Sequence, residues 1–212
     1  MKILSHRGYW KKAEEKNTCL AFERSFSLGF GTETDIRDLA GELVISHDMP
    51  RDGALSAREL FEIHQRENPG LELALNIKSD GLQLPLMSLI EEFSIENYFL
   101  FDMSIPDALV CLRHGLKCFT RQSEYEPDPS FYQQAEGVWI DGFHGEWWDE
   151  SIIQRHLDAA KKVCIVSPDL HRRPHQSCWN ILAGWSIQAH PGLMLCTDLP
   201  EDAKQLFESA VQ

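Results

Sequence analysis

The first 36 residues have the pattern of a strand, a helix and a second strand. The apolar run KILS lies at residues 2–5, the segment TCLAFERSFSL at 18–28 and the extended run GTETDI at 31–36. In the middle segment the apolar residues recur at helical spacing, so that they gather near one face. Two strands joined through a helix are the repeating unit of parallel α/β folds. This opening therefore favours a parallel sheet flanked by helices.

The same alternation continues along the rest of the chain. Short apolar or β-branched runs predict eight strands, at residues 2–5, 31–36, 72–77, 98–101, 117–120, 137–140, 163–166 and 193–196. Helical spacing and start signals predict helices at 18–28, 56–64, 82–93, 106–114, 128–134, 149–160, 174–187 and 200–211. Eight such pairs predict a compact (β/α)8 TIM barrel with short insertions, built as a single domain over residues 1–212. The alternative is an open doubly wound sheet, although no G-x-G-x-x-G follows the first strand.

One irregularity interrupts the second repeat. Residues 38–42 (DLAGE) have the composition of a tight turn, and residues 43–46 form another extended run. We therefore expect the second strand to be prolonged as a small hairpin.

The charge balance excludes two classes of function. The 212 residues include 20 Lys and Arg against 33 Asp and Glu, which gives a formal net charge of −13. Nonspecific binding of nucleic acid needs a basic face that neutralises phosphates. Anionic membranes likewise attract clusters of basic residues. We expect no nucleic acid polymer as a partner, and no attachment to an anionic membrane surface.

The cysteines and the hydropathy pattern bear on location. The six cysteines form no C-x-x-C pair, and several lie in apolar runs, which indicates buried, reduced thiols in a reducing compartment. The N-terminal segment has no apolar signal-peptide core, and no later stretch approaches the roughly 18 apolar residues of a membrane span. The sequence therefore predicts a cytoplasmic protein without membrane insertion, and it leaves the oligomeric state open.

Ionisable residues concentrate at the carboxyl ends of the predicted strands, where active sites of barrel enzymes lie. Glu33 and Asp35 are two positions apart on one strand, so their side chains share a face. Two close carboxylates repel unless a cation or a proton lies between them. Oxygen ligands of this kind suit Mg²⁺ or Ca²⁺. We therefore expect Glu33 and Asp35 to be metal ligands.

Two histidines and two cations complete this predicted site. His6 follows the first strand and His47 follows the hairpin, and imidazoles titrate near neutral pH, so the two are suited to act as a general acid and a general base. Arg7 and Lys78 supply the fixed positive charge that a phosphate needs. The combination predicts metal-assisted phosphoryl chemistry.

The ends of the later strands supply a second set of candidates. Arginine side chains there could bind a further anionic group, and a tryptophan could stack on a sugar or a base, which suggests a sugar- or nucleotide-containing phosphodiester. The competing interpretations are packing at the barrel rim for the tryptophan and solvent exposure for the arginine at residue 172. The candidate substrate-binding residues are Arg121, Glu124, Asp141, Trp147, His171 and Arg172.

Several of these elements together resemble the glycerophosphodiester phosphodiesterase family. The matching elements are H-R-G at residues 6–8, N-T at 17–18, E-T-D at 33–35, S-H-D at 46–48 and, near the end, LCTDLP at 195–200. The likeness is dense over about the first fifty residues and weak from 80 to 190. It implies a TIM-barrel phosphoric diester hydrolase with a role in lipid metabolism, in which His6 and His47 catalyse, Glu33 and Asp35 bind a divalent cation, and Arg7 and Lys78 hold the phosphate.

Two positions depart from the family pattern. Lys16 stands where the family has Glu before Asn-Thr, and Asn76 stands where it has an acidic third metal ligand. An amide oxygen can coordinate Mg²⁺ or Ca²⁺ without contributing charge, so we expect Asn76 to be a weak ligand. The alternatives are a replacement carboxylate, from Asp102, Glu124 or Asp141, or a changed activity.

Two other functions compete with a metal-dependent phosphodiesterase. Lys78 could act as the Schiff-base nucleophile of an aldolase, which requires an activated amine. The departure at Asn76 also allows a non-catalytic barrel that binds a phosphoester without turning it over.

Overall fold

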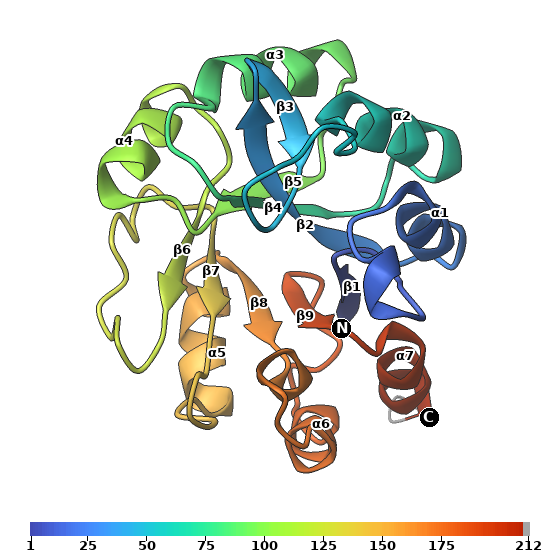
Figure 1. The fold of residues 1–212 in the computed structure, drawn as a ribbon. Helices are drawn as coiled ribbons and strands as arrows, with labels where there is room; N and C mark the ends of the chain where they lie inside the picture. Colours follow the sequence, from blue (N-terminus) through green and yellow to red (C-terminus); the bar gives the residue numbers. More distant parts are fainter. Residues whose placement is uncertain (210–212) are drawn as a thin grey trace. The chain divides into compact units, whose positions relative to one another are not determined.

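The computed structural model describes residues 1–209 of the chain. The chain divides into two compact units, one of residues Ser5–Cys118 and one of Met1–Leu4 together with the chain from Phe119 onward (Figure 1). Strand β1 (Lys2–His6) contributes residues to both. The prediction of a single domain remains a prediction, and each unit is described in turn.

The 5–118 unit is built on parallel strands. β2 (Gly31–Leu39), β4 (Leu73–Ile77) and β5 (Tyr98–Phe101) follow β1, in the spatial order β5-β4-β2-β1. The register places Asp35 of β2 opposite Asn76 of β4. Its helices, which lie around these strands in Figure 1, are η1 (Ala13–Glu15), α1 (Cys19–Ser27), α2 (Ala57–Glu67), α3 (Gln83–Glu92) and α4 (Ile105–Arg113).

The predicted hairpin is present. β3 (Glu42–Ile45) pairs antiparallel with the distal part of β2. The turn residues Ala40 and Gly41 have φ angles of 52° and 90°. Two consecutive positive φ angles match the twist of a tight hairpin, and the glycine adopts its angle without a steric penalty.

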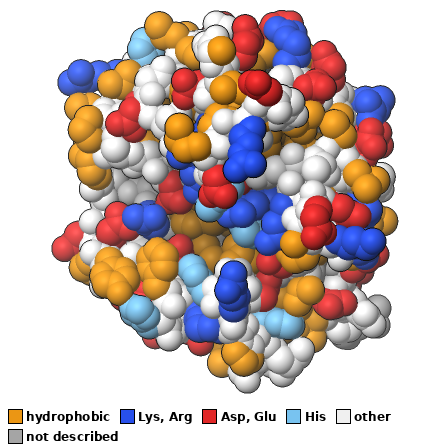
Figure 2. Space-filling model, in the orientation of Figure 1, with side chains coloured by type: hydrophobic (Ala, Val, Ile, Leu, Met, Phe, Trp, Pro, Cys, Tyr) orange, Lys and Arg blue, Asp and Glu red, His pale blue; other side chains and the backbone are white. Residues whose placement is uncertain are grey.

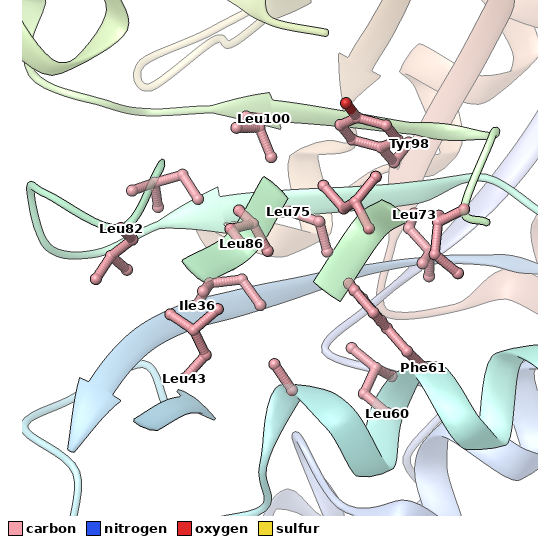
Figure 3. Close-up of a cluster of buried hydrophobic side chains, with 14 of the residues drawn as sticks. Ile36, Leu43, Leu60, Phe61, Leu73, Leu75, Leu82, Leu86, Tyr98 and Leu100 are labelled. Carbon is pink, nitrogen blue, oxygen red and sulfur yellow. The ribbon is translucent and has the colours of Figure 1, made fainter. Parts of the chain in front are cut away.

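A hydrophobic core fills the space between strands and helices of the 5–118 unit. Leu60 and Phe61 extend from α2 toward the side chains of Ile36 and Leu75 on the strands (Figure 3), and all four are fully buried. Helix α2 begins at a capping box, in which Ser56 and Glu59 satisfy each other's backbone N–H groups. The cap fixes where the helix starts and therefore which residues face the sheet.

The second unit repeats the same design. Helices α5, α6 and α7 alternate with strands β7, β8 and β9 in Figure 1, and the strands run parallel in the spatial order β9-β8-β7-β6. The strands are β6 (Phe119–Gln122), β7 (Gly137–Ile140), β8 (Lys162–Val166) and β9 (Leu193–Thr197), and the helices are α5 (Glu150–Asp158), η2 (Pro168–His171), α6 (Gln176–Ala183) and α7 (Pro200–Ser209).

All eight predicted parallel strands are confirmed, with ends that differ by at most three residues, but one predicted helix is wrong. The segment predicted as a helix at 128–134 is a turn after residue 129, because Phe131 has a φ of 56° and receives hydrogen bonds from Gln134 N and Ala135 N at the carbonyl. A left-handed residue cannot continue a right-handed helix. Helix α6 is shorter than predicted, at Gln176–Ala183. The last predicted helical positions, 210–211, lie outside the described residues.

The cysteines agree with the expected reduced thiols. All six are free, and all but Cys19 are buried. Within residues 1–209, no helix combines the length and the apolar content needed to cross a bilayer.

Replacing Phe61 with alanine should destabilise the protein strongly. The ring is fully buried against the sheet, and Phe→Ala changes in cores cost about 3–5 kcal/mol through lost burial and the cavity that remains. Urea denaturation should show this loss for Phe61→Ala. The matched control, Leu84→Ala on α3, removes a side chain that is 56% exposed and should change stability by less than about 1 kcal/mol. Equal effects of the two substitutions would contradict the described core.

Candidate active site

Two buried carboxylates lie side by side on β2. Glu33 and Asp35 are 2% and 1% exposed, and their positions in the strand direct both side chains to one face. Burial of an unpaired carboxylate is costly, so such groups need cations, protons or hydrogen bonds. The surrounding residues supply basic side chains and hydrogen bonds.

Three basic side chains of the 5–118 unit face this pair. Arg7 Nε lies 3.2 Å from Asp35 Oδ2, and Lys78 Nζ lies 3.4 Å from Asp35 Oδ1. His6 Nε2 lies 3.8 Å from Glu33 Oε2. The structure therefore brings together five of the predicted site residues, two within β2 and three at the carboxyl ends of β1 and β4.

A left-handed turn after β1 aims Arg7 at the carboxylates. Arg7 and Gly8 have φ angles of 59° and 76°, and the Arg7 backbone N–H donates to the carbonyl of Glu33 at 2.8 Å. A Cβ on Gly8 would lie 2.8 Å from the Cβ of Ala21, so a side chain cannot be accommodated without displacing α1. The glycine of H-R-G is thus required by packing as well as by its backbone angle.

Asn17 is a site residue to which the sequence analysis assigned no role. Its amide donates to Asp35 Oδ2 at 2.9 Å and accepts from the Thr34 hydroxyl at 2.9 Å, while its backbone N–H donates to the carbonyl of Arg7. Asn17 also has a φ of 59°, which asparagine tolerates better than most residues. It therefore orients Asp35 and fixes the Arg7 turn. The Asn-Thr pair in the motif was the available signal.

Burial shifts the proton equilibrium of Glu33. Desolvation, reinforced by the charge of Asp35, raises the pKa of Glu33 to about 7, against the opposing effects of His6, Arg7 and Lys78. Glu33 can therefore carry a proton near neutral pH.

The oxygen atoms present fit a divalent cation. Asp35 Oδ1 and Asn76 Oδ1 are buried and accept no hydrogen bond from the described residues, and Asp35 and Asn76 are paired in register on adjacent strands. Buried acceptors are normally satisfied. Asp35 Oδ1 faces the Lys78 ammonium at 3.4 Å without a hydrogen bond, and Asn76 Oδ1 accepts none, so these oxygens are suited to a further positive group. The donors are hard oxygens, as Mg²⁺ and Ca²⁺ prefer. Within residues 1–209 no three Asp, Glu, His or Cys side chains gather in this way, so the third ligand would be the amide.

His47 is more exposed than the residues that face the buried carboxylates, since its side chain is 45% exposed. It follows β3, and its Nδ1 lies 2.8 Å from Asp48 Oδ1. Hydrogen bonding to His47 lowers the pKa of Asp48, which keeps this carboxylate charged and orients the imidazole. His47 and Arg7 both line an open pocket of about 1010 Å³, which Lys16 and Asn17 also border.

The predicted substrate-binding residues belong to the other unit, and most of them have local contacts there. Trp147 Nε1 donates to the carbonyl of Asp141 at 2.6 Å, and His171 Nε2 lies 2.6 Å from Asp141 Oδ1. Arg121 forms an ion pair with Glu126. Arg172 is exposed. These contacts leave their roles in substrate binding as predictions.

Glu124 holds a loop of its own unit. Its carboxylate accepts hydrogen bonds from the backbone N–H groups of Phe143 at 3.1 Å and His144 at 2.9 Å. Burial raises the pKa of Glu124, but these backbone donors outweigh it and lower the pKa overall. This carboxylate therefore has a structural use, and help from Glu124 or Asp141 at the predicted metal site remains a prediction.

Asp169, after β8, is a second residue to which the sequence analysis gave no role. Its carboxylate accepts from the Thr197 hydroxyl at 2.9 Å and from the Asp198 backbone N–H at 2.8 Å. It thereby ties the ends of β8 and β9 together. No periodicity in the sequence could have indicated this contact, because it depends on strand pairing.

Comparison with known proteins shows the fold. The sequence matches no family model and no curated protein. Among solved structures, the glycerophosphodiester phosphodiesterase of Agrobacterium tumefaciens is similar with a TM-score of 0.70 at 15% identity, over 99% of each chain. An Oleispira antarctica phosphodiesterase in complex with the product sn-glycerol-3-phosphate is similar with a TM-score of 0.68 at 15% identity, over 100% of this chain and 96% of the other. The Thermotoga maritima glycerophosphodiester phosphodiesterase is similar with a TM-score of 0.66 at 14% identity, over 96% of this chain and 97% of the other.

These likenesses confirm the predicted fold class. The chain is a (β/α)8 TIM barrel, and the similar structures have nearly its own length. At such low identities the likeness reaches no further than the fold, because one barrel scaffold hosts many chemistries.

The pKa of Glu33 predicts how stability depends on pH in chelator-treated protein. Its ordinary value is 4.5, and the folded state raises it to about 7. Between these two values the folded protein binds more protons than the unfolded chain, so the free energy of unfolding should fall as the pH rises and then level off above about 7.

Glu33→Gln should remove this pH dependence of the free energy of unfolding. A tenfold change in proton affinity is worth about 1.4 kcal/mol, so the variant should gain on the order of 1–3 kcal/mol relative to the wild type between pH 4.5 and pH 8. Thermal denaturation across this range measures the difference. Glu91→Gln, at an exposed position, is the matched control and should show no such gain. A constant difference between Glu33→Gln and the wild type would contradict the raised pKa.

Proposed function

We propose that this chain is a glycerophosphodiester phosphodiesterase-like enzyme that cleaves a small phosphodiester. The proposal rests above all on Arg7 and Lys78, which both lie within 3.4 Å of Asp35 beside a second buried carboxylate, Glu33. Such a cluster offers fixed positive charge to a phosphate and oxygen ligands to a cation. The three similar barrels are named phosphodiesterases, which supports the same chemistry here.

The substrate phosphate is bound by Arg7 and Lys78. The guanidinium of Arg7 is held by Asp35 and by the left-handed turn, so it is already oriented when a ligand arrives. Arginine binds phosphate oxygens in a planar fork, whereas lysine acts as a point charge. Together they stabilise the charge that develops on phosphorus oxygens in the transition state.

Glu33, Asp35 and Asn76 would hold Mg²⁺ or Ca²⁺. When bound, the divalent cation would polarise the phosphoryl oxygens as a Lewis acid. The two carboxylates then no longer need a proton between them, because the cation neutralises their mutual repulsion.

His6 and His47 move the protons. One imidazole accepts the proton of a substrate hydroxyl that attacks the phosphorus, and the other donates a proton to the oxygen of the departing alcohol. The attack forms a P–O bond and breaks the bond to the leaving alcohol, which yields a cyclic phosphate that water can open to a phosphomonoester. Asp48 orients His47 through Nδ1, so Nε2 is the nitrogen left for proton transfer.

The charge distribution favours small substrates over polymers. Acidic and basic side chains are interspersed over the visible face of the molecule (Figure 2), and the net charge is −13. Binding of a polyanion needs many phosphate contacts, whereas one positive cluster suffices for a single phosphodiester. The proposal includes a cytoplasmic location and a place in lipid metabolism.

The two competing functions receive less support. Lys78 is paired with Asp35, which suits it for binding phosphate as a cation, whereas a Schiff-base nucleophile must be a free amine. A binding protein without turnover would not need two histidines that lie beside carboxylates. The experiment below distinguishes a binding protein from the proposed enzyme.

Loss of either histidine should abolish turnover. His6→Ala and His47→Ala should each lower kcat by about 10²–10⁴-fold on a glycerophosphodiester, because each removes one proton transfer. Phosphorus NMR follows the substrate, the cyclic phosphate and the phosphomonoester in one spectrum. His114→Ala, at an exposed helix end, is the matched control and should retain full activity.

The same experiment separates the alternatives. Full activity in either histidine variant would overturn the assignment of the acid–base pair. If the wild type binds the phosphodiester tightly and forms no product over hours, the proposed activity is wrong and the chain is a binding protein.

Removal of divalent cations should also stop the reaction. Treatment with EDTA should lower turnover by about a hundredfold or more, since loss of electrostatic stabilisation worth about 3 kcal/mol has this effect. Added Mg²⁺ or Ca²⁺ should restore it in the wild type but not in Glu33→Gln. Turnover that persists after exhaustive chelation would contradict the cation requirement.

A further inference from the structure

The most informative contact that the proposed function does not use lies at Asn76. This residue, at the end of β4, is 7% exposed and stands in register with Asp35. Its Oδ1 is buried without a hydrogen-bond donor, while its Nδ2 donates to Asp102 Oδ2 at 3.2 Å. The nitrogen of this amide thus has a hydrogen-bond partner, whereas its oxygen has none.

An amide ligand has an orientation problem that a carboxylate does not. A carboxylate presents oxygen whichever way it rotates by 180°, whereas an amide presents either its oxygen or its NH₂ group. Beside Glu33 and Asp35, the NH₂ group would itself be stabilised by donating to a carboxylate, and that orientation would expel a cation. Something must therefore hold the oxygen toward the pair.

Asp102 is placed to do this. The register pairs Asn76 with Phe101, the last residue of β5, and Asp102 follows directly with a φ of 64°. Asp102 can only accept hydrogen bonds when it is ionised, so it selects the NH₂ group of Asn76. The oxygen of the same amide is then turned away from Asp102.

We propose that Asp102 is a positioning residue that fixes the Asn76 amide so that its oxygen, and not its NH₂ group, serves as the third ligand of the cation. The inference rests on the proposed function, because it concerns the cation site assigned to Glu33, Asp35 and Asn76. It assigns a role to a carboxylate on the neighbouring strand end that does not itself touch the cation. Residues that orient metal ligands typically contribute 10- to 100-fold in affinity.

A double-mutant cycle in cation affinity tests this role without any measurement of activity. Calorimetric titration of the chelated protein with Ca²⁺ and with Mg²⁺ should show about 10-fold weaker binding for Asp102→Ala than for the wild type. In an Asn76→Asp background the ligand is a carboxylate that needs no orientation. There Asp102→Ala should not weaken binding, and it should tighten it wherever repulsion between the two carboxylates is relieved.

Controls distinguish the possible outcomes. Asp80→Ala, which removes a carboxylate that accepts from Ser104 on the same side of the unit, should leave cation binding unchanged. Equal weakening by Asp102→Ala in both backgrounds would overturn the positioning role in favour of a general charge or structural effect. Wild-type affinity in Asp102→Ala, with loss of binding in Glu33→Gln, would overturn the inference alone. Absence of Ca²⁺ and Mg²⁺ binding by the wild type would overturn the cation site itself and, with it, the inference.

Discussion

The burial of two carboxylates on one face of β2 is the constraint on which the site depends. Glu33 and Asp35 cannot both be ionised in that position without compensation, because burial and mutual repulsion oppose their charges. The flanking strand ends supply that compensation through Arg7 and Lys78, while Asn17 fixes the geometry by hydrogen bonds. The basic groups and amides around β2 thus all serve to stabilise the same two buried negative charges.

The sequence predicted the fold because local periodicity determines it. Buried strands and amphipathic helices alternate throughout, and the turn at Ala40 and Gly41 could be read from its composition. The one wrong helix, at 128–134, fails at Phe131, whose left-handed backbone no pattern of hydrophobic residues reveals. Backbone angles of single non-glycine residues are set by tertiary contacts and therefore escape such an analysis.

The site was predictable only in part. Glu33 and Asp35 could be placed together because two positions on one strand share a face. The hydrogen bonds of Asn17 to Asp35 and of Asn76 to Asp102 could not be derived, since each joins residues remote in the sequence. Residue types that catalyse are visible in a sequence, whereas the residues that orient them become visible only when strands are paired.

The difference in exposure between the two halves of the site has a consequence for ionic strength. Asp48 is 91% exposed beside His47, whereas Asp35 is 1% exposed beside Arg7. Mobile ions screen exposed pairs strongly and buried pairs weakly. Salt therefore weakens the contact that orients the His47 imidazole, while it leaves Arg7 held beside Asp35. The two ion pairs can thus be perturbed separately without any mutation.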